Sequence, residues 1–223
     1  MIDIIVIDEN NTLLIAKHSM PNRRKTKELI RELVTNYIRT TDIRSARLIH
    51  KEYVPYIVDR SGDNLANCSF SYAGNYAIAF ISNNRRVGID IELCDRVNKV
   101  KGIIFEYFKI DEKFNSCKST ERFMWSLHEA LGKLEKVGIF SELRVLDVES
   151  CKENQHFIDK FTNKISASEL FDFLCYKSSS INKMVDVTYQ VRQGSEKKVA
   201  ICYLLQTKEF YLVVALEKLQ EVS

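Results

Sequence analysis

The sequence predicts an α+β protein in a pseudo-twofold arrangement of two similar α/β halves, each with a small antiparallel sheet and a long helix. One segment, from about residue 25, carries apolar residues at three- and four-residue steps, the spacing of an amphipathic helix, and a second long helical stretch ends before Gly138. Short β-like runs bounded by turn residues fill much of the remaining chain. One hairpin pattern occurs twice, first as Phe70 with 76–80 and again as Tyr203 with 210–215.

The first long helix is predicted from about residue 25 onward, because Pro21 and Asn22 mark its start. Six residues at helical spacing form its apolar face: Leu29, Ile30, Leu33, Val34, Tyr37 and Ile38. A basic cluster lies at its first turn, made of Arg23, Arg24, Lys25 and Lys27. Such a cluster is more often a solvated surface than a site, so it gains meaning only if other residues indicate an anionic ligand.

Extended segments follow this helix in the first half of the chain. Residues 47–50 and 53–58 have β-like composition, and residues 59–64 form a turn-rich stretch. Three further β-like runs, at 68–70, 76–82 and 87–93, are separated by connections suited to hairpins. We expect these three runs to form a small antiparallel meander.

The second half repeats this order of elements. A helical stretch is predicted at 103–108, and a longer helix from about 119 to 136 that ends before Gly138. Three β-like runs follow, at 183–191, 199–205 and 210–216. We therefore expect two halves, 1–100 and 101–223, with a cleft at their junction, where sites often lie.

Composition excludes several classes of protein. With 223 residues and 45% apolar residues, the chain can bury a good core. Its longest apolar runs are far shorter than the roughly 20 residues that cross a bilayer, and the acidic residues of Met1–Asp8 do not suit a signal peptide. A net charge of +3 does not require a nucleic acid. We expect a cytoplasmic protein with reduced cysteines, no membrane and no nucleic-acid partner.

The first candidate site lies on the β-like run 87–93. Strand alternation places Gly88, Asp90 and Glu92 on one face and four apolar residues on the other. Two carboxylates then point together from an otherwise apolar strand. The competing interpretation is the polar face of a half-exposed strand, which is the more frequent case for such a pattern taken alone.

The second candidate site lies on the helix near residue 130. Trp125, Glu129 and Lys133 follow each other at four-residue steps and therefore share one helical face. The competing interpretation is a simple Glu–Lys pair, worth about 0.3–0.5 kcal/mol, beside a core tryptophan. Gly132 argues against it, because glycine inside a helix costs about 1 kcal/mol relative to alanine and often marks the close approach of a neighbour.

Together these residues predict a magnesium site. Mg²⁺ prefers a few carboxylate oxygens and completes its octahedron with water and ligand phosphates, so Asp90, Glu92 and Glu129 are suitable ligands. Lys133, one turn beyond Glu129, is placed to neutralise a phosphate on the same ion. The chemistry indicated is phosphoryl transfer.

The same residues resemble the Sfp-type phosphopantetheinyl transferases of the holo-[acyl-carrier-protein] synthase superfamily. That family has a Gly-Ile-Asp-x-Glu strand, then a Trp-Ser/Thr-x-Lys-Glu-Ala/Ser-x-x-Lys helix, and an upstream Ile-Ser-His-Ser-Gly segment. Here these are residues 88–92, 125–133 and 70–74, in the same order and at similar spacing. A further similarity lies at 107–112, where two aromatic residues precede acidic ones. The resemblance spans roughly Ser69 to Gly138.

The resemblance implies a pseudo-twofold fold that holds coenzyme A between its halves. It implies Mg²⁺ on Asp90, Glu92 and Glu129, with Glu129 also accepting, directly or through water, the proton of a serine on an acyl or peptidyl carrier protein as that serine attacks the β-phosphate. Lys133 would stabilise the charge on the transferred phosphate or on the leaving group, and 3′,5′-ADP would leave. Ser71 and Tyr72 match positions on the 3′-phosphate side of the nucleotide, and a monomer is expected.

The implied coenzyme A contacts extend beyond that pair. Asp90 and Lys133 belong to them through the pyrophosphate, and Arg23, Arg24 and Lys27 are candidates for the 3′-phosphate. The chain departs from the family at His128 and Tyr72, where relatives have lysine and histidine, and two cationic partners are thereby weakened. The family's Gly-Lys-Pro tripeptide is reduced to residues 53–55 (YVP). These departures bear on coenzyme A affinity and carrier preference more than on the chemical step.

Two other functions compete with this interpretation. A Mg²⁺-dependent nuclease or phosphodiesterase could use the same carboxylates, but the aromatic residues mostly follow core periodicity and do not alternate with the basic ones. A non-catalytic carrier-binding protein could keep the fold and lose coenzyme A through Tyr72 and His128. The presence of all three carboxylates and of Lys133 argues against that loss.

Overall fold

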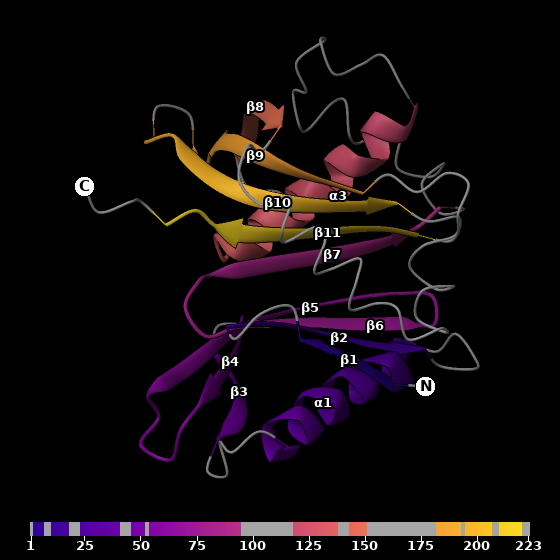
Figure 1. Cartoon of the computed structure of the whole chain (residues 1–223), viewed down its shortest axis with the longest axis vertical. Helices are drawn as coiled ribbons and strands as arrows, with labels where there is room; N and C mark the ends of the chain where they lie inside the picture. Colours follow the sequence, from indigo (N-terminus) through magenta and orange to yellow (C-terminus); the bar gives the residue numbers. More distant parts are fainter. Residues whose placement is uncertain are drawn as a thin grey trace.

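The fold is described from a computed structural model of the chain. The structure describes residues 2–6, 10–17, 23–40, 46–51, 54–94, 118–137, 143–150, 182–192, 195–206 and 210–219. Two antiparallel sheets lie face to face, and one long helix packs on the outer side of each (Figure 1). The predicted α+β class, with two antiparallel sheets and two long helices, is confirmed.

The first sheet has six strands, all antiparallel to their neighbours, in the order β1-β2-β6-β5-β4-β3. In chain order they are β1 (Ile2–Val6), β2 (Asn11–Lys17), β3 (Arg47–Lys51), β4 (Val54–Val58), β5 (Asn64–Ala73) and β6 (Tyr76–Ser82). The β5–β6 hairpin turns at Gly74, whose φ of 57° suits a primed hairpin turn. The extended segments and this hairpin were predicted, whereas β1 and β2 were not.

The second sheet has five antiparallel strands in the order β7-β11-β10-β9-β8. They are β7 (Val87–Leu93), β8 (Arg144–Ser150), β9 (Asn182–Gln190), β10 (Lys198–Gln206) and β11 (Phe210–Glu217). The prediction that β7 is the third strand of a meander with β5 and β6 is wrong, because β7 pairs with β11 at the far end of the chain. Its spacing from β6 allowed a hairpin, but the turn instead carries the chain into the other sheet.

The two sheets repeat one topology. In the first, β2 is followed by helix α1 (Arg23–Thr40) and then β3 to β6, with β2 pairing with β6. In the second, β7 is followed by helix α3 (Lys118–Leu134) and then β8 to β11, with β7 pairing with β11. Hairpins β5–β6 and β10–β11 therefore hold equivalent places. The change of sheet falls between β6 and β7, so the first hundred residues include one strand of the second sheet.

Helix α1 covers the outer face of the first sheet. Its buried residues Ile30, Leu33, Val34 and Ile38 follow the predicted apolar face. They pack on small and branched side chains of the central strands, among them Ala77, Ala79 and Ile81 of β6. Alanines at these positions let the helix approach the sheet closely.

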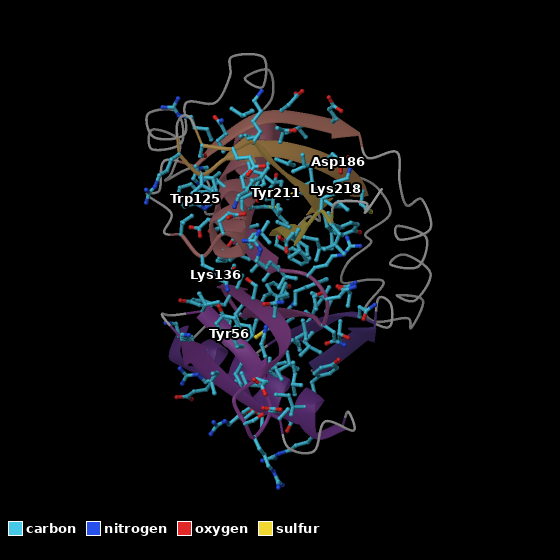
Figure 2. All side chains as sticks on the ribbon, turned by 90° about the vertical axis from the view of Figure 1, so that its left-hand side faces the viewer. Tyr56, Trp125, Lys136, Asp186, Tyr211 and Lys218 are labelled. Carbon is cyan, nitrogen blue, oxygen red and sulfur yellow. The ribbon has the colours of Figure 1, made fainter. Side chains whose placement is uncertain are left out.

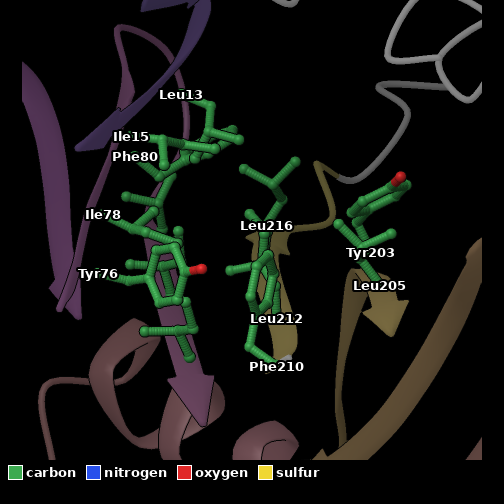
Figure 3. Close-up of a cluster of buried hydrophobic side chains, with 14 of the residues drawn as sticks. Leu13, Ile15, Tyr76, Ile78, Phe80, Tyr203, Leu205, Phe210, Leu212 and Leu216 are labelled. Atoms are coloured by element: carbon green, nitrogen blue, oxygen red, sulfur yellow. The ribbon is translucent and has the colours of Figure 1, made fainter. Parts of the chain in front are cut away.

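A second core fills the space between the two sheets. Alternate residues of β2 and β6 face this core, and alternate residues of β7, β10 and β11 face it from the other side (Figure 3). Tyr76 and Phe210 meet there with ring centroids 5.4 Å apart. Burial of each large apolar side chain contributes about 1.5–3 kcal/mol, so this core holds the two sheets together.

Helix α3 ends in a turn that contacts the first sheet. The Val137 amide donates to the Gly132 carbonyl at 2.8 Å, the Lys136 amide donates to the Lys133 carbonyl at 3.2 Å, and Lys136 has a φ of 60°. This is the Schellman arrangement, in which glycine usually takes the left-handed position. The Lys136 ammonium lies against Tyr56 of β4, with its Nζ 4.6 Å from the ring centroid (Figure 2).

A buried carboxylate fixes the same end of α3 on the second sheet. Glu135 accepts hydrogen bonds from the Tyr189 hydroxyl and from Lys198, both at 2.6 Å. Arg86, which precedes β7, lies 3.5 Å from Glu135 and also donates to Glu217 at the end of β11. These contacts join α3 to four strands or strand ends, so the helix has little freedom to slide.

Some predictions concern residues outside the described ranges. The helical stretch at 103–108 and the aromatic–acidic segment at 107–112 both fall there. Strand β8 was not predicted.

Neither described helix is long and apolar enough to span a membrane.

Candidate active site

The candidate site forms where helix α3 crosses strand β7 in direct backbone contact. A Cβ placed on Gly88 would lie 1.9 Å from the Ala130 carbonyl oxygen and 2.7 Å from the Leu134 amide nitrogen. Only glycine allows this approach. The close approach expected at Gly132 is not present among the described residues, because a Cβ there would meet only the Val137 oxygen, at 3.4 Å.

Contact at Gly88 brings the predicted strand and helix residues together. Lys133 Nζ donates to Asp90 Oδ1 at 2.9 Å, to the Ile89 carbonyl at 2.9 Å and to Ser71 Oγ at 3.3 Å. Ser71 Oγ in turn donates to Asp90 Oδ1 at 3.0 Å and accepts from the Ile91 amide at 3.2 Å. Asp90 and Ser71 are buried, and Lys133 is partly exposed. One hydrogen-bonded network thus joins β5 of the first sheet to β7 and α3 of the second.

One oxygen of this network has no partner. Asp90 Oδ2 is buried and, among the described residues, accepts no hydrogen bond. A buried carboxylate oxygen without a donor carries a desolvation cost that a cation would offset. Asp90 therefore presents one satisfied oxygen and one bare oxygen on the face of β7 that α3 covers.

The other two carboxylates, Glu92 and Glu129, lie close by, and each has a raised pKa. Burial and then the charge of Asp90 raise the pKa of Glu92 to about 7, with Glu129 adding to the shift. Trp125 Nε1 donates to Glu92 Oε1 at 3.3 Å. Burial, followed by the charge of Asp90, also raises the pKa of Glu129. The strand and helix carboxylates, predicted to lie together, are therefore close enough to repel one another electrostatically.

The raised pKa of Glu92 makes stability depend on pH. Between the usual value of 4.5 and about 7, the folded protein keeps a proton that the unfolded chain has released, so the free energy of unfolding falls as pH rises through this window. We expect Glu92→Gln to match the wild type near pH 4.5 and to melt at a higher temperature at pH 8. Thermal unfolding in EDTA at several pH values tests this, and parallel pH profiles for the two proteins would contradict it.

These residues fit a divalent cation by their chemistry. Three carboxylates, two of them with a raised pKa and the third with a bare buried oxygen, are hard oxygen donors that a cation would relieve of repulsion. As the side chains stand, however, no three His, Cys, Asp or Glu residues among those described are grouped closely enough to hold a metal ion. The three carboxylates therefore suit Mg²⁺ by charge and donor type and are not a preformed ligand cluster.

The remaining predicted residues lie on the other face of the first sheet. Tyr72, next to Ser71 on β5, points to the side covered by α1, where Lys27 Nζ lies 5.5 Å from the centroid of its ring. Arg23 and Arg24 belong to the first turn of α1, and their side chains lie outside the described set. The structure thus separates the predicted nucleotide residues into a Ser71 group and a Tyr72 group, as strand alternation requires.

Residues near Tyr72 were not predicted as site residues. Phe70, two positions earlier on β5, packs on the same side, and its ring lies edge-on to His50 of β3 with centroids 6.2 Å apart. Burial and then the charge of Arg31 lower the pKa of His50. The alternation of side chains along β5 predicts that Phe70 and Tyr72 share one face of the strand. The sequence alone does not show that this face lies against α1 and β3.

His128, the departure from the family pattern on α3, has a structural contact. It is buried, and its Nε2 donates to the Leu143 carbonyl at 2.8 Å, just before β8. Burial lowers its pKa, so the ring is held neutral. His128 therefore ties α3 to β8 and takes no part in the hydrogen-bonded network of Asp90 and Lys133.

Comparison with known proteins gives no further assignment. No protein-family model matches the chain, and no curated protein matches it.

Proposed function

We propose that this protein is a Mg²⁺-dependent phosphopantetheinyl transferase of the Sfp type. It would move the phosphopantetheine arm of coenzyme A to a serine of an acyl or peptidyl carrier protein and release 3′,5′-ADP. The observation that carries the proposal is the convergence of Asp90 and Glu92 on β7 with Glu129 and Lys133 on α3. These are the residues of the two motifs that resemble the family.

The repeated topology supports the same proposal. The resemblance implies two similar halves with the substrate between them, and five strands of the first sheet have the same order and helix position as the five strands of the second. The network of Ser71, Asp90 and Lys133 lies where the two sheets meet. A substrate bound there would contact both repeats.

The carboxylates and the lysine of the candidate site would have different roles in the transfer. Asp90, Glu92 and Glu129 would hold Mg²⁺, which when bound neutralises charge on the pyrophosphate of coenzyme A. Glu129, a carboxylate beside Asp90 and Lys133, would accept the proton of the carrier serine as that hydroxyl attacks the β-phosphate. Lys133 would turn from Asp90 to the phosphate and stabilise the charge that develops there.

The basic and aromatic face near α1 is suited to the nucleotide end of coenzyme A. Lys27 and Arg31 supply positive charge, and the partly exposed Phe70 and Tyr72 supply ring surface for an adenine. We place the 3′-phosphate near Lys27 and Tyr72. This placement retains two of the residues that the resemblance implies and adds Phe70 and Arg31 from the structure.

A transfer assay tests the proposal. The protein would be incubated with coenzyme A, Mg²⁺ and a panel of apo carrier proteins, with an EDTA control, and each carrier read by intact mass spectrometry. We expect a metal-dependent gain of one phosphopantetheine on at least one carrier. No gain on any carrier, together with no coenzyme A binding by titration, would overturn the enzyme proposal in favour of a non-catalytic carrier-binding protein.

Substitution of the carboxylates should remove transfer without unfolding the protein. Asp90→Asn and Glu129→Gln keep side-chain size and remove the charge, so each should slow transfer at least about a hundredfold. Asp186→Asn is the matched control, since this carboxylate lies on β9 and pairs with Lys218 at 2.8 Å. Unfolding temperatures would establish folding. Full transfer activity in Asp90→Asn or Glu129→Gln would contradict the assignment.

A further inference from the structure

The hydrogen-bonding capacity of the Ser71 hydroxyl is fully taken up by contacts within the protein. A serine hydroxyl offers one donor and two acceptor lone pairs. Here it donates to Asp90 Oδ1 at 3.0 Å and accepts from the Ile91 amide at 3.2 Å and from Lys133 at 3.3 Å. Ser71 is 6% exposed. No capacity remains in this arrangement for a phosphate oxygen.

Strand geometry also separates Ser71 from the basic face. Tyr72 points toward α1 and Lys27, so its neighbour Ser71 points toward β7 and the second sheet. Lys27, the described α1 cation that contacts the Tyr72 ring, therefore lies on the face of β5 opposite to Ser71. The cation that Ser71 does meet is Lys133, which is also bonded to Asp90.

We propose that Ser71 is a positioning residue that orients Asp90 for a divalent cation, an inference that rests on the proposed function. Anchored on the Ile91 amide, its hydroxyl donates to Oδ1 of Asp90 and fixes the plane of the carboxylate. Oδ2, which is buried and accepts no hydrogen bond among the described residues, is thereby left as the oxygen for a cation to bind. Groups that orient metal-binding carboxylates typically change metal affinity about 10–100-fold when they are removed.

Ser69 supplies a matched control two residues earlier on the same face of β5. Its Oγ accepts from the Ile89 amide at 3.1 Å, as Ser71 Oγ accepts from the Ile91 amide, and it is 4% exposed. Both serines thus cap the free edge of β7. Of the two serines, only Ser71 is also hydrogen-bonded to the Asp90 carboxylate. A loss of metal affinity in both alanine variants would therefore come from the disturbed edge of β7, and a loss in the Ser71 variant alone would come from the Asp90 contact.

The first measurement is metal affinity without coenzyme A or carrier. Mn²⁺ binding would be measured by calorimetry on the wild type, Ser71→Ala, Ser69→Ala and Ser71→Thr, which keeps the hydroxyl. We expect Ser71→Ala to bind Mn²⁺ about 10–100-fold more weakly, and the other two variants to stay within about threefold of the wild type. If Ser71→Ala does not fold, Ser71→Cys, with its weak thiol donor, takes its place in the same comparison.

The second measurement separates positioning from phosphate binding. Transfer rates would be compared with coenzyme A and with dephospho-coenzyme A, which lacks the 3′-phosphate. A positioning role predicts the same loss in Ser71→Ala on both substrates, whereas a Ser71 contact to the 3′-phosphate predicts a loss with coenzyme A alone. Lys27→Met should lose activity with coenzyme A and not with dephospho-coenzyme A, and it serves as the reference for a contact to the 3′-phosphate.

The outcomes distinguish this inference from the proposed function. Equal Mn²⁺ affinity in the wild type and Ser71→Ala, an equal loss in Ser69→Ala, or no Mn²⁺ binding by the wild type would each overturn the positioning role. Transfer by the wild type would still uphold the enzyme in those cases. Conversely, a Ser71-specific loss of Mn²⁺ affinity in a protein that modifies no carrier would support the positioning role and count against the transferase.

Discussion

Gly88→Ala is expected to destabilise the protein by about 3 kcal/mol or more and to abolish the function of the site. The added Cβ would lie 1.9 Å from the Ala130 carbonyl oxygen, and backbone atoms cannot move aside as a flexible side chain can. Helix α3 must therefore shift away from β7. Even a protein that folds should lose about a hundredfold in transfer rate, because a displacement of about 1 Å separates Lys133 from Asp90.

Gly132→Ala is the matched control for this prediction. Gly132 lies inside the same helix, but its added Cβ would meet only the Val137 oxygen, at 3.4 Å. Alanine is favoured over glycine in a helix by up to about 1 kcal/mol, so this variant should be as stable as the wild type or slightly more so. Urea unfolding of both variants decides the matter. Similar stability for Gly88→Ala and Gly132→Ala would show that α3 does not contact β7 as described.

Lys133→Met is expected to change metal affinity and transfer in opposite directions. In the absence of a ligand, the Lys133 ammonium occupies Asp90 Oδ1 and supplies positive charge next to Glu92 and Glu129. It thereby competes with and repels a divalent cation. Its removal should tighten Mn²⁺ binding about tenfold, since the lost repulsion between close charges exceeds 1.4 kcal/mol at intermediate dielectric. Transfer should nevertheless fall by about 100-fold or more, because the transferred phosphate loses its counter-charge.

Lys136→Met controls for the general loss of a positive charge near the end of α3. Lys136 contacts Tyr56, and its ammonium takes no part in the hydrogen bonds of Asp90. Its substitution should leave Mn²⁺ affinity within about twofold, because an exposed charge outside the network is screened by solvent. Calorimetric titration of both variants is the test. Weaker Mn²⁺ binding by Lys133→Met would show that this lysine assists the cation and does not compete with it.

Among the described residues, the charged cluster of the candidate site belongs to the second of the two repeated units. On the face of β2 that α1 covers, the first unit places Leu14 and Ala16 in the helix-facing core. The corresponding face of β7, covered by α3, carries Gly88, Asp90 and Glu92 instead. The first unit thus uses this position for packing, and the second uses it for charge.

The sequence by itself determined much of the local structure and which residues share a face within each element of the candidate site. Helical periodicity located α1, because an amphipathic helix shows its buried face every three to four residues, and the glycine at 138 marked the end of α3. Strand alternation placed Asp90 and Glu92 on one face of β7, and four-residue spacing placed Trp125, Glu129 and Lys133 on one face of α3. These are properties of neighbouring residues, which the chain specifies locally.

Only the tertiary structure decided which elements meet. The pairing of β7 with β11 joins residues more than a hundred positions apart, and nothing in the local pattern of β7 distinguishes that partner from β6. Strand alternation puts Ser71 and Tyr72 on opposite faces of β5, but only the structure shows what covers each face. Ser71 contacts β7, and Tyr72 contacts α1. Gly88, and not Gly132, proved to be the close-contact glycine, because contact depends on which backbone lies opposite. Long-range pairing and packing fix these choices, since they depend on the free energy of the whole fold and not on that of any one segment.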